Sequence, residues 1–582
     1  MQRPPSTSVD SQNACAAPSF PSPVPQAQWL QQVASLIPKN TSHPVQVTIR
    51  TYCLALCLSL GPSLVPFLTS RSYSKKTSLK RVLARELDFR GFAFSVTLAV
   101  GGGSFIRRLW HALDSLDADT SGSGAWTAAL PLKTWISLLR LRLSSVQKTF
   151  LSNVISSTAG LLLLQAGRRR SKLRASLVNK EPSASRTLDL TLLLLVRALD
   201  AGVQSFVAQR SGSRRESDAE HPGKTSQTDM QRIAASAHRE ALRKQIDSFL
   251  FWACSARIMW CFFYEQQRLP VSYVKWINTL AGLDSRLLET LRAIRTRQWS
   301  YRTGLSSPPD LLKAYARDLG YPAAWGDPAI LPAYGGSDAD EVWKQLGLTT
   351  RSGVGGVPCQ VVHGRVGSNF GLEHSCTANA TLRGIKAFLE AIAIYLPVQF
   401  LPVILSRPRA LLDPQRVLES LFSALRSATF LSTFVATYWY SVCLTRSVIF
   451  ARLFPFISHD FYDGPFGCVL AGCLVCGSSI WIENGRRRGE MALYVLPRAV
   501  RSCLPDTWVR SGNWGVLMTE RLTFVLSLSS LLTAASHHAH VLRGLSRWGL
   551  RFILRGPDVV FWRDNSAFPS EKRKIHNPNP VK

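Results

Sequence analysis

FLSNVISSTAGLLLLQAGRRRSKLR, residues 150–174, contains the pattern that predicts the fold. Its first part, Phe150–Gly167, is apolar almost all round and approaches the roughly 20 residues that a helix needs to cross hydrocarbon. Its second part places five basic residues, Arg168–Arg170, Lys172 and Arg174, directly after that run. An apolar helix followed by a basic loop is typical of a membrane-spanning segment.

Similar apolar runs recur along most of the chain. They are Val45–Leu68, Gly91–Ile106, Leu188–Val207 and a shorter Ser248–Tyr264, and later Ala387–Leu405, Leu421–Cys443, Phe466–Ile482, Met491–Cys503 and Trp514–Ala535. This series predicts an all-α, polytopic transmembrane helical bundle with roughly 8–10 membrane segments. The short run leaves two alternatives open: it is interfacial, or the following stretch Val271–Leu291 returns across the membrane.

The composition excludes several classes of protein. The 582 residues include 69 Lys+Arg and 37 Asp+Glu, a formal charge of +32, yet 46% of the residues are hydrophobic. A chain this apolar is not disordered as a whole, and 12 Cys are too few for a disulfide-built scaffold. The basic residues gather in alternate loops between apolar runs, which favours a membrane protein over a nucleic-acid binder. We therefore expect membrane lipids as partners and no nucleic acid.

Three blocks of the first half recur in the same order in the second half. The pairs are Lys80–Gly102 with Gln415–Thr437, Leu161–Arg170 with Ser478–Arg488, and Leu188–Leu199 with Gly489–Val500. We interpret them as an internal tandem duplication, and the like-signed loops favour parallel copies.

The predicted organisation has seven parts. They are a disordered tail (1–45), a first membrane repeat (46–210), a polar linker (211–235), amphipathic or membrane-associated helices (236–300), a polar connecting segment (301–384), a second membrane repeat (385–540) and a basic C-terminal tail (541–582).

Charged residues lie inside two apolar runs with the same spacing. Asp189 and Arg197 are eight residues apart, as are Glu490 and Arg498. A buried arginine is costly in a membrane, so it needs a carbonyl, an acid, water or a ligand. A structural pairing between helices and a site for an anionic lipid headgroup both remain open.

Small residues recur every four positions in two other runs. Ser152, Ser156 and Gly160 form one row, and Cys468, Gly472 and Cys476 form the other. Such rows let helices approach closely in a membrane.

One polar segment carries candidate metal ligands. Cys359, His363, His374 and Cys376 fall within PCQVVHGRVGSNFGLEHSC, with the spacing C-x3-H-x10-H-x-C. Two thiols and two imidazoles are enough for a tetrahedral zinc site. The spacing matches no standard finger, however, and His-x-Cys is a tight pair for one metal. The alternative is a polar loop packed over the membrane domain, and we expect that alternative, with no cofactor and no catalytic residue.

Several of these motifs together resemble the transmembrane protein 135 family. The motifs are HSC (His374–Cys376) before an apolar run with Tyr395–Pro397, the block at Gln415, and ENGRRRGEMALYVLPRA (Glu483–Ala499). Arg257–Ile277 resembles the fungal members. The small-residue run, basic loop and Tyr-x-x-x-Arg-Ala are shared more loosely with peroxisomal membrane proteins of the Tim-type translocase superfamily. The first repeat lacks the Tyr of this motif.

The resemblance implies a multi-pass protein of a peroxisomal or mitochondrial membrane, without established catalysis, linked to lipid homeostasis and organelle dynamics. We therefore expect a non-enzymatic protein that organises a membrane or passes a lipid or small solute, with homo-oligomers or other organelle membrane proteins as further partners. The alternative function is a membrane-embedded, metal-dependent enzyme that uses the Cys/His cluster.

Overall fold

The computed structural model describes residues 38, 40–69, 83–84, 87–89, 91–119, 143–176, 187–219, 227–349, 351–406, 413–505, 507–508 and 513–556. Within these residues the regular structure is helical, and the only β pairing is an isolated bridge between Trp299 and Ser306. The all-α prediction is confirmed. The predicted tail 1–45 lies almost wholly outside the described residues.

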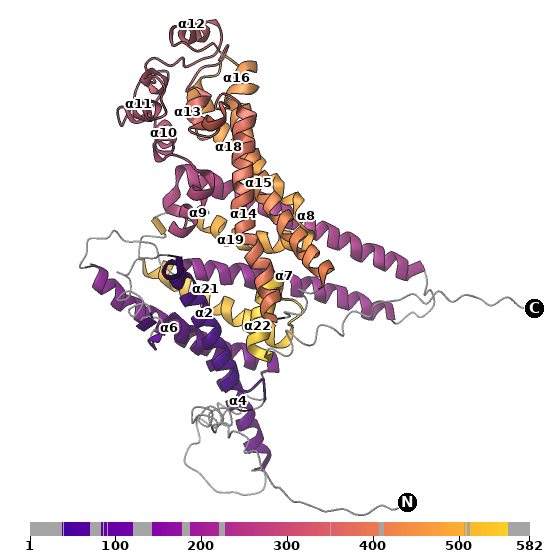
Figure 1. Cartoon of the computed structure of the whole chain (residues 1–582). Helices are drawn as coiled ribbons and strands as arrows, with labels where there is room; N and C mark the ends of the chain where they lie inside the picture. Colours follow the sequence, from indigo (N-terminus) through magenta and orange to yellow (C-terminus); the bar gives the residue numbers. More distant parts are fainter. Residues whose placement is uncertain are drawn as a thin grey trace, which may run out of the picture.

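The first bundle contains the N-terminal helices together with the last two of the chain. It comprises α2 (Pro44–Thr69), α4 (Phe92–Asp119), α6 (Ser145–Ser176), α7 (Leu188–Ala219), α21 (Trp514–His537) and α22 (Gly544–Arg555). Helix α4 packs between α2 and α6, and α21 packs on α6 and α7. In Figure 1 this bundle occupies the lower part of the view, where the indigo and yellow ends of the chain meet.

The second bundle is built from the middle of the chain. It comprises α8 (Gln227–Tyr264), α14 (Cys376–Ser406), α15 (Pro414–Cys443), α18 (Cys468–Cys476), the 3-10 helix η7 (Gly477–Ile482) and α19 (Gly485–Cys503). Asp413 caps α15 by accepting from the Gln415 amide, and Pro414 occupies its first turn. Helix α19 also packs on α7 and so joins the two bundles.

A cap covers one end of the second bundle. It comprises residues 265–375, with α9 (Val271–Ala281), α10 (Ser285–Arg295), α11 (Leu311–Asp318), α12 (Ser337–Gln345) and α13 (Cys359–His363). Its core is aromatic, with Trp299, Trp325 and Trp343 all buried. The cap lies at the top of Figure 1, above α14 and α15. Residues 444–467, which include α16 (Phe450–Leu453) and α17 (His459–Tyr462), leave the second bundle and pack against the cap.

Five helices of the described chain are long and apolar enough to cross a membrane. They are Ser145–Ala166, Leu188–Val207, Ala237–Tyr264, Pro414–Leu453 and Trp514–His537, and two shorter apolar helices are Pro44–Leu60 and Cys468–Ile482. The structure is thus that of a helical bundle compatible with a multi-pass membrane protein. The predicted run Met491–Cys503 lies in α19, where several arginines interrupt the apolar surface.

Several expected boundaries differ from the helices. The 211–235 segment, expected as a linker, contains the end of α7 and the start of α8. Residues 301–384, expected as a connecting segment, contain much of the cap and its aromatic core. The short run Ser248–Tyr264 is the apolar half of α8, and Val271–Leu291 divides into two short helices, α9 and α10, rather than one crossing. Part of the expected tail 541–582 is α22, which packs on α2 and α21.

The two rows of small residues lie at helix contacts. Ser156 on α6 donates to the Ala99 carbonyl on α4 at 2.8 Å, and Gly160 leaves no room there for a side chain. Gly472 on α18 lies in the same way against the Tyr438 ring of α15. The other members of the two rows are also buried: Ser152, Cys468 and Cys476. Close approach of this kind gives packing contacts where lipid supplies no hydrophobic drive.

Candidate functional site

Ion pairs connect α7 to α19, and we call this contact the seam. Arg197 Nη1 lies 3.4 Å from Glu490 Oε2, and Arg501 pairs with Asp189. The earlier residue of α7, Asp189, meets the later residue of α19, Arg501, and the later residue, Arg197, meets the earlier one, Glu490. The two helices therefore run antiparallel. If the two helices are equivalent members of a duplication, this antiparallel contact does not favour parallel copies.

The four charged residues predicted from sequence thus have different surroundings. Three of them, Asp189, Arg197 and Glu490, are in the seam, and the fourth, Arg498, is not. The partner of Asp189 is Arg501, a residue that was not among the four predicted. Sequence reasoning also missed Arg543, which pairs with Asp200 at 3.4 Å and Asp247 at 3.3 Å beside the seam. An acid and a base that meet from different helices have no fixed spacing in the sequence, so no sequence pattern predicts the pair.

Arg498 lies between aromatic rings. Its guanidinium carbon is 4.0 Å from the centre of the Tyr494 ring and 5.3 Å from that of Tyr273, and it donates to the Tyr494 carbonyl. No carboxylate of the described residues pairs with it. Aromatic faces stabilise a cation without neutralising it. Arg498 therefore keeps a charge that an anion can still use.

The Cys/His cluster forms where the cap meets the second bundle. Ligand atoms of Cys359, His363 and Cys376 all lie within 4.8 Å of one another. Cys359 and His363 are at the two ends of α13, four residues apart and so on one face, while Cys376 opens α14. Three of the four residues predicted from sequence are thus brought together.

The fourth predicted residue lies outside the cluster, and another cysteine lies beside it. His374 Nδ1 is 2.9 Å from Gln360 Nε2, and His374 does not belong to the cluster of ligand atoms. Cys443, at the end of α15, places its sulfur 3.4 Å from His363 Nε2. Sequence reasoning missed Cys443 because it lies at the end of an apolar run, where a cysteine resembles an ordinary packing residue.

Buried charges surround this cluster, and we call the whole set the junction. It contains the four residues Cys359, His363, Cys376 and Cys443, together with Arg351, Arg383, Arg446 and Asp463. Arg446 makes two bonds to Asp463, at 2.8 and 3.0 Å, and both side chains are almost fully buried. Tyr301 donates to Asp463 at 2.6 Å. Burial opposes ionisation of Asp463, but Arg446 outweighs it and holds the pKa at about 2.

The other two arginines of the junction have different partners. Arg351 Nη1 lies 3.6 Å from Cys359 Sγ, and its other arm donates to the Gly355 carbonyl. Arg383 donates to the carbonyls of Ala281 and His363 and lies 3.8 Å from the centre of the Trp439 ring. In the described part of the chain neither has a carboxylate partner. Two of the three buried guanidinium groups therefore lack a compensating carboxylate.

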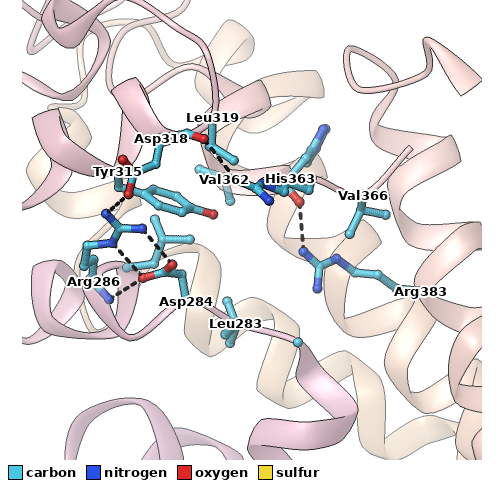
Figure 2. Close-up of a pocket in the computed structure, with 14 residues that line it drawn as sticks. Leu283, Asp284, Arg286, Tyr315, Asp318, Leu319, Val362, His363, Val366 and Arg383 are labelled. Carbon is cyan, nitrogen blue, oxygen red and sulfur yellow. Dashed lines mark hydrogen bonds and ion pairs between the residues drawn. The ribbon is translucent and has the colours of Figure 1, made fainter. Parts of the chain in front are cut away.

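A cleft of about 570 Å³ borders the junction. Figure 2 shows Arg286 on one wall, bonded to Asp284 and Asp318, and Arg383 on the other, donating to the His363 carbonyl. Arg286 lies 3.0 Å from Asp284 and 2.6 Å from Asp318, so its charge is already neutralised. Arg365 and Arg383 also line the cleft and bond to carbonyls rather than to carboxylates, and the cleft shares His363 with the Cys/His cluster.

Comparison of the chain with family models, with curated proteins and with solved structures finds no match. The class of protein is therefore defined by the fold and by the chemistry of its sites: an all-α bundle with helices able to cross a membrane, an ion-paired seam and a buried Cys/His cluster.

Proposed function

We propose that this chain is a non-enzymatic integral protein of a peroxisomal or mitochondrial membrane, and that it acts on membrane lipids. Its role would be in lipid homeostasis, organelle dynamics, or the passage of a lipid or small solute. The apolar helices support the membrane location. The resemblance to the transmembrane protein 135 family, carried by the motifs around His374, Gln415 and Glu483, supports the organelle and the link to lipids.

We also propose that the two bundles descend from one duplicated unit. The recurring sequence blocks fall in α4, α6 and α7 of the first bundle and in α15, η7 and α19 of the second. The packing order supports this: α2 on α4 matches α14 on α15, and α4 on α6 matches α15 on α18. The helices that follow α7 and α19 are exchanged, because α8 packs on α19 and α21 packs on α7. Exchange of this kind would hold the two copies together.

The observation that carries the lipid role is the contrast between Arg197 and Arg498. Arg197 is paired with Glu490, whereas Arg498 is held by aromatic rings and a carbonyl. An arginine in an apolar segment persists only where something compensates its charge. Basic positions of this kind bind anionic lipid headgroups. Arg498 is accordingly the residue that contacts lipid headgroups in this proposal, and Arg197 is a structural residue.

Single substitutions in cells that lack the native protein test this assignment. We expect Arg498→Leu to change the lipid profiles of peroxisomes or mitochondria while the protein level stays normal. Arg197→Leu is the matched variant on the equivalent helix, and we expect it to lower the amount of folded protein instead. Unaltered lipid profiles with Arg498→Leu at a normal protein level would contradict the lipid role. Release of the chain from the membrane pellet by carbonate would contradict integral insertion.

The alternative of a metal-dependent enzyme receives less support from the geometry. A catalytic zinc keeps one position open for water or substrate. Cys359, His363 and Cys443 are all buried, and the Cys443 sulfur lies against His363 Nε2 beside the three clustered ligand atoms. Such a cluster fits a structural role better than a catalytic one.

A further inference from the structure

We propose that Cys359, His363, Cys376 and Cys443 together bind one structural Zn²⁺ that fastens the cap to α14 and α15. The first three place their ligand atoms within 4.8 Å of one another. The Cys443 sulfur lies 3.4 Å from His363 Nε2, although it is not within 4.8 Å of all three of those atoms. With Zn–S bonds of about 2.3 Å and Zn–N bonds of about 2.0 Å, tetrahedral ligands lie roughly 3.5–3.8 Å apart. The three clustered atoms are near this spacing and the Cys443–His363 distance matches it, so binding would draw the sulfurs inward around the ion.

The imidazole is oriented as a zinc ligand would be. His363 Nδ1 is 2.8 Å from the Glu373 carbonyl, a contact in which the ring nitrogen donates its proton. The other nitrogen, Nε2, then carries the lone pair and faces the Cys443 sulfur. Zinc-bound histidines commonly use this arrangement, because the second hydrogen bond fixes both the tautomer and the ring plane. Arg383 adds a bond to the His363 carbonyl at 3.0 Å and so holds the backbone of the same residue.

The charge of the junction provides an independent argument. Arg351 and Arg446 are both buried beside Cys359, but only Asp463 balances them. An uncompensated buried charge is strongly destabilising. Zn²⁺ with three thiolates and one neutral imidazole carries one negative charge. Such a centre would offset the Arg351 guanidinium, which three neutral thiols would leave unbalanced, while Arg383 is held by two carbonyls and the Trp439 ring.

The position of the ligands explains what the ion would do. Two of the ligands come from the cap, one from the start of α14, and one from the end of α15. There α15 passes into a short π-helix at Leu444–Val448. π-turns inside helices occur frequently at functional sites. A zinc ion here would cross-link segments far apart in the sequence and fix the cap to the second bundle.

The test is the zinc content of the purified full-length chain, compared across matched variants. We expect about one Zn per chain in the wild type, as a closed tetrahedral site requires. Cys443→Ser and Cys359→Ser should lose most of the bound zinc. His374→Ala, which the sequence suggested as a ligand, should retain it, as should Cys473→Ser, a buried cysteine of α18 outside the cluster.

Two results would overturn the proposal, and neither depends on a variant that folds. One is wild-type protein without stoichiometric zinc. The other is a disulfide within the cluster, detected when alkylation of denatured, unreduced wild-type protein leaves two of these thiols unmodified. Loss of zinc from His374→Ala to the same extent as from Cys443→Ser would also contradict the assignment of Cys443. This inference is independent of the lipid role, so that either can fail alone.

Discussion

The seam and the junction both bury arginines, but they neutralise them differently. In the seam Arg197 and Arg501 each face a carboxylate on the opposite helix, and Arg543 beside it faces two. In the junction only Arg446 has a carboxylate, while Arg351 faces the Cys359 sulfur. Charge in the seam is balanced by the side chains themselves. Charge in the junction is balanced only if the sulfurs are thiolates, and a bound metal is what keeps buried thiols deprotonated.

Removal of zinc should have the largest effect and should separate the two regions. Binding free energy of a structural zinc ion is folding free energy, so we expect the junction to lose at least about 3 kcal/mol of local stability. Hydrogen exchange measured peptide by peptide, before and after a strong chelator, checks this. Peptides of α13 and the start of α14 should exchange faster, and seam peptides of α7 should not change. Equal acceleration in both regions would contradict the contrast.

Asp463→Asn should be the next largest effect. It leaves the Arg446 guanidinium buried without its carboxylate, which costs about 3–5 kcal/mol in comparable buried pairs. The readout is the thermal unfolding of the full chain in detergent, followed by tryptophan fluorescence of the cap. Asp318→Asn is the control, because its pair with Arg286 is largely exposed and should contribute under about 1 kcal/mol. A similar loss in both variants would show that the burial of Arg446 is not what matters.

Mild acid should weaken the junction through His459, whose Nδ1 lies 3.9 Å from Asp463 Oδ2. Burial lowers the pKa of this histidine to about 3, below its ordinary value of 6.5. Because the unfolded chain binds the proton first, stability is complete above pH 6.5 and declines as the pH falls toward 3. Between pH 6.5 and 5 we expect a loss of roughly 2 kcal/mol from this group.

Unfolding of wild type and His459→Asn at the two pH values measures this contribution. The variant lacks the titrating group, so its stability should fall less between pH 6.5 and 5. Acid also releases zinc, and that contribution is common to both proteins. An equal fall in wild type and variant would exclude His459 as an acid-sensitive group.

Arg197→Leu in the seam should have the smallest effect of the four. Arg197 is 13% exposed and Glu490 is 33% exposed, so solvent reaches the acid that remains. We expect a loss of about 1 kcal/mol, measured by thermal unfolding in detergent. The exchange Arg197→Glu with Glu490→Arg should restore most of it. A loss as large as that of Asp463→Asn would show that the seam is as strongly desolvated as the junction.

The sequence was sufficient to predict the helical class because apolar runs and basic loops are local signals. It also identified residues in each region: Arg197 in the seam, and Cys359 and His363 in the junction. It failed where partners are distant in the chain. The bond of Asp189 to Arg501 and the arrival of Cys443 beside His363 depend on how helices are packed. His374 is of a suitable residue type, yet its ring nitrogen is bonded to Gln360 instead.

The most direct test of the junction is X-ray absorption at the zinc edge of the purified wild-type protein. We expect three sulfur ligands at about 2.3 Å and one nitrogen at about 2.0–2.1 Å. A zinc ion bound only by nitrogen and oxygen, or two sulfurs with two nitrogens, would contradict the assignment of Cys359, His363, Cys376 and Cys443.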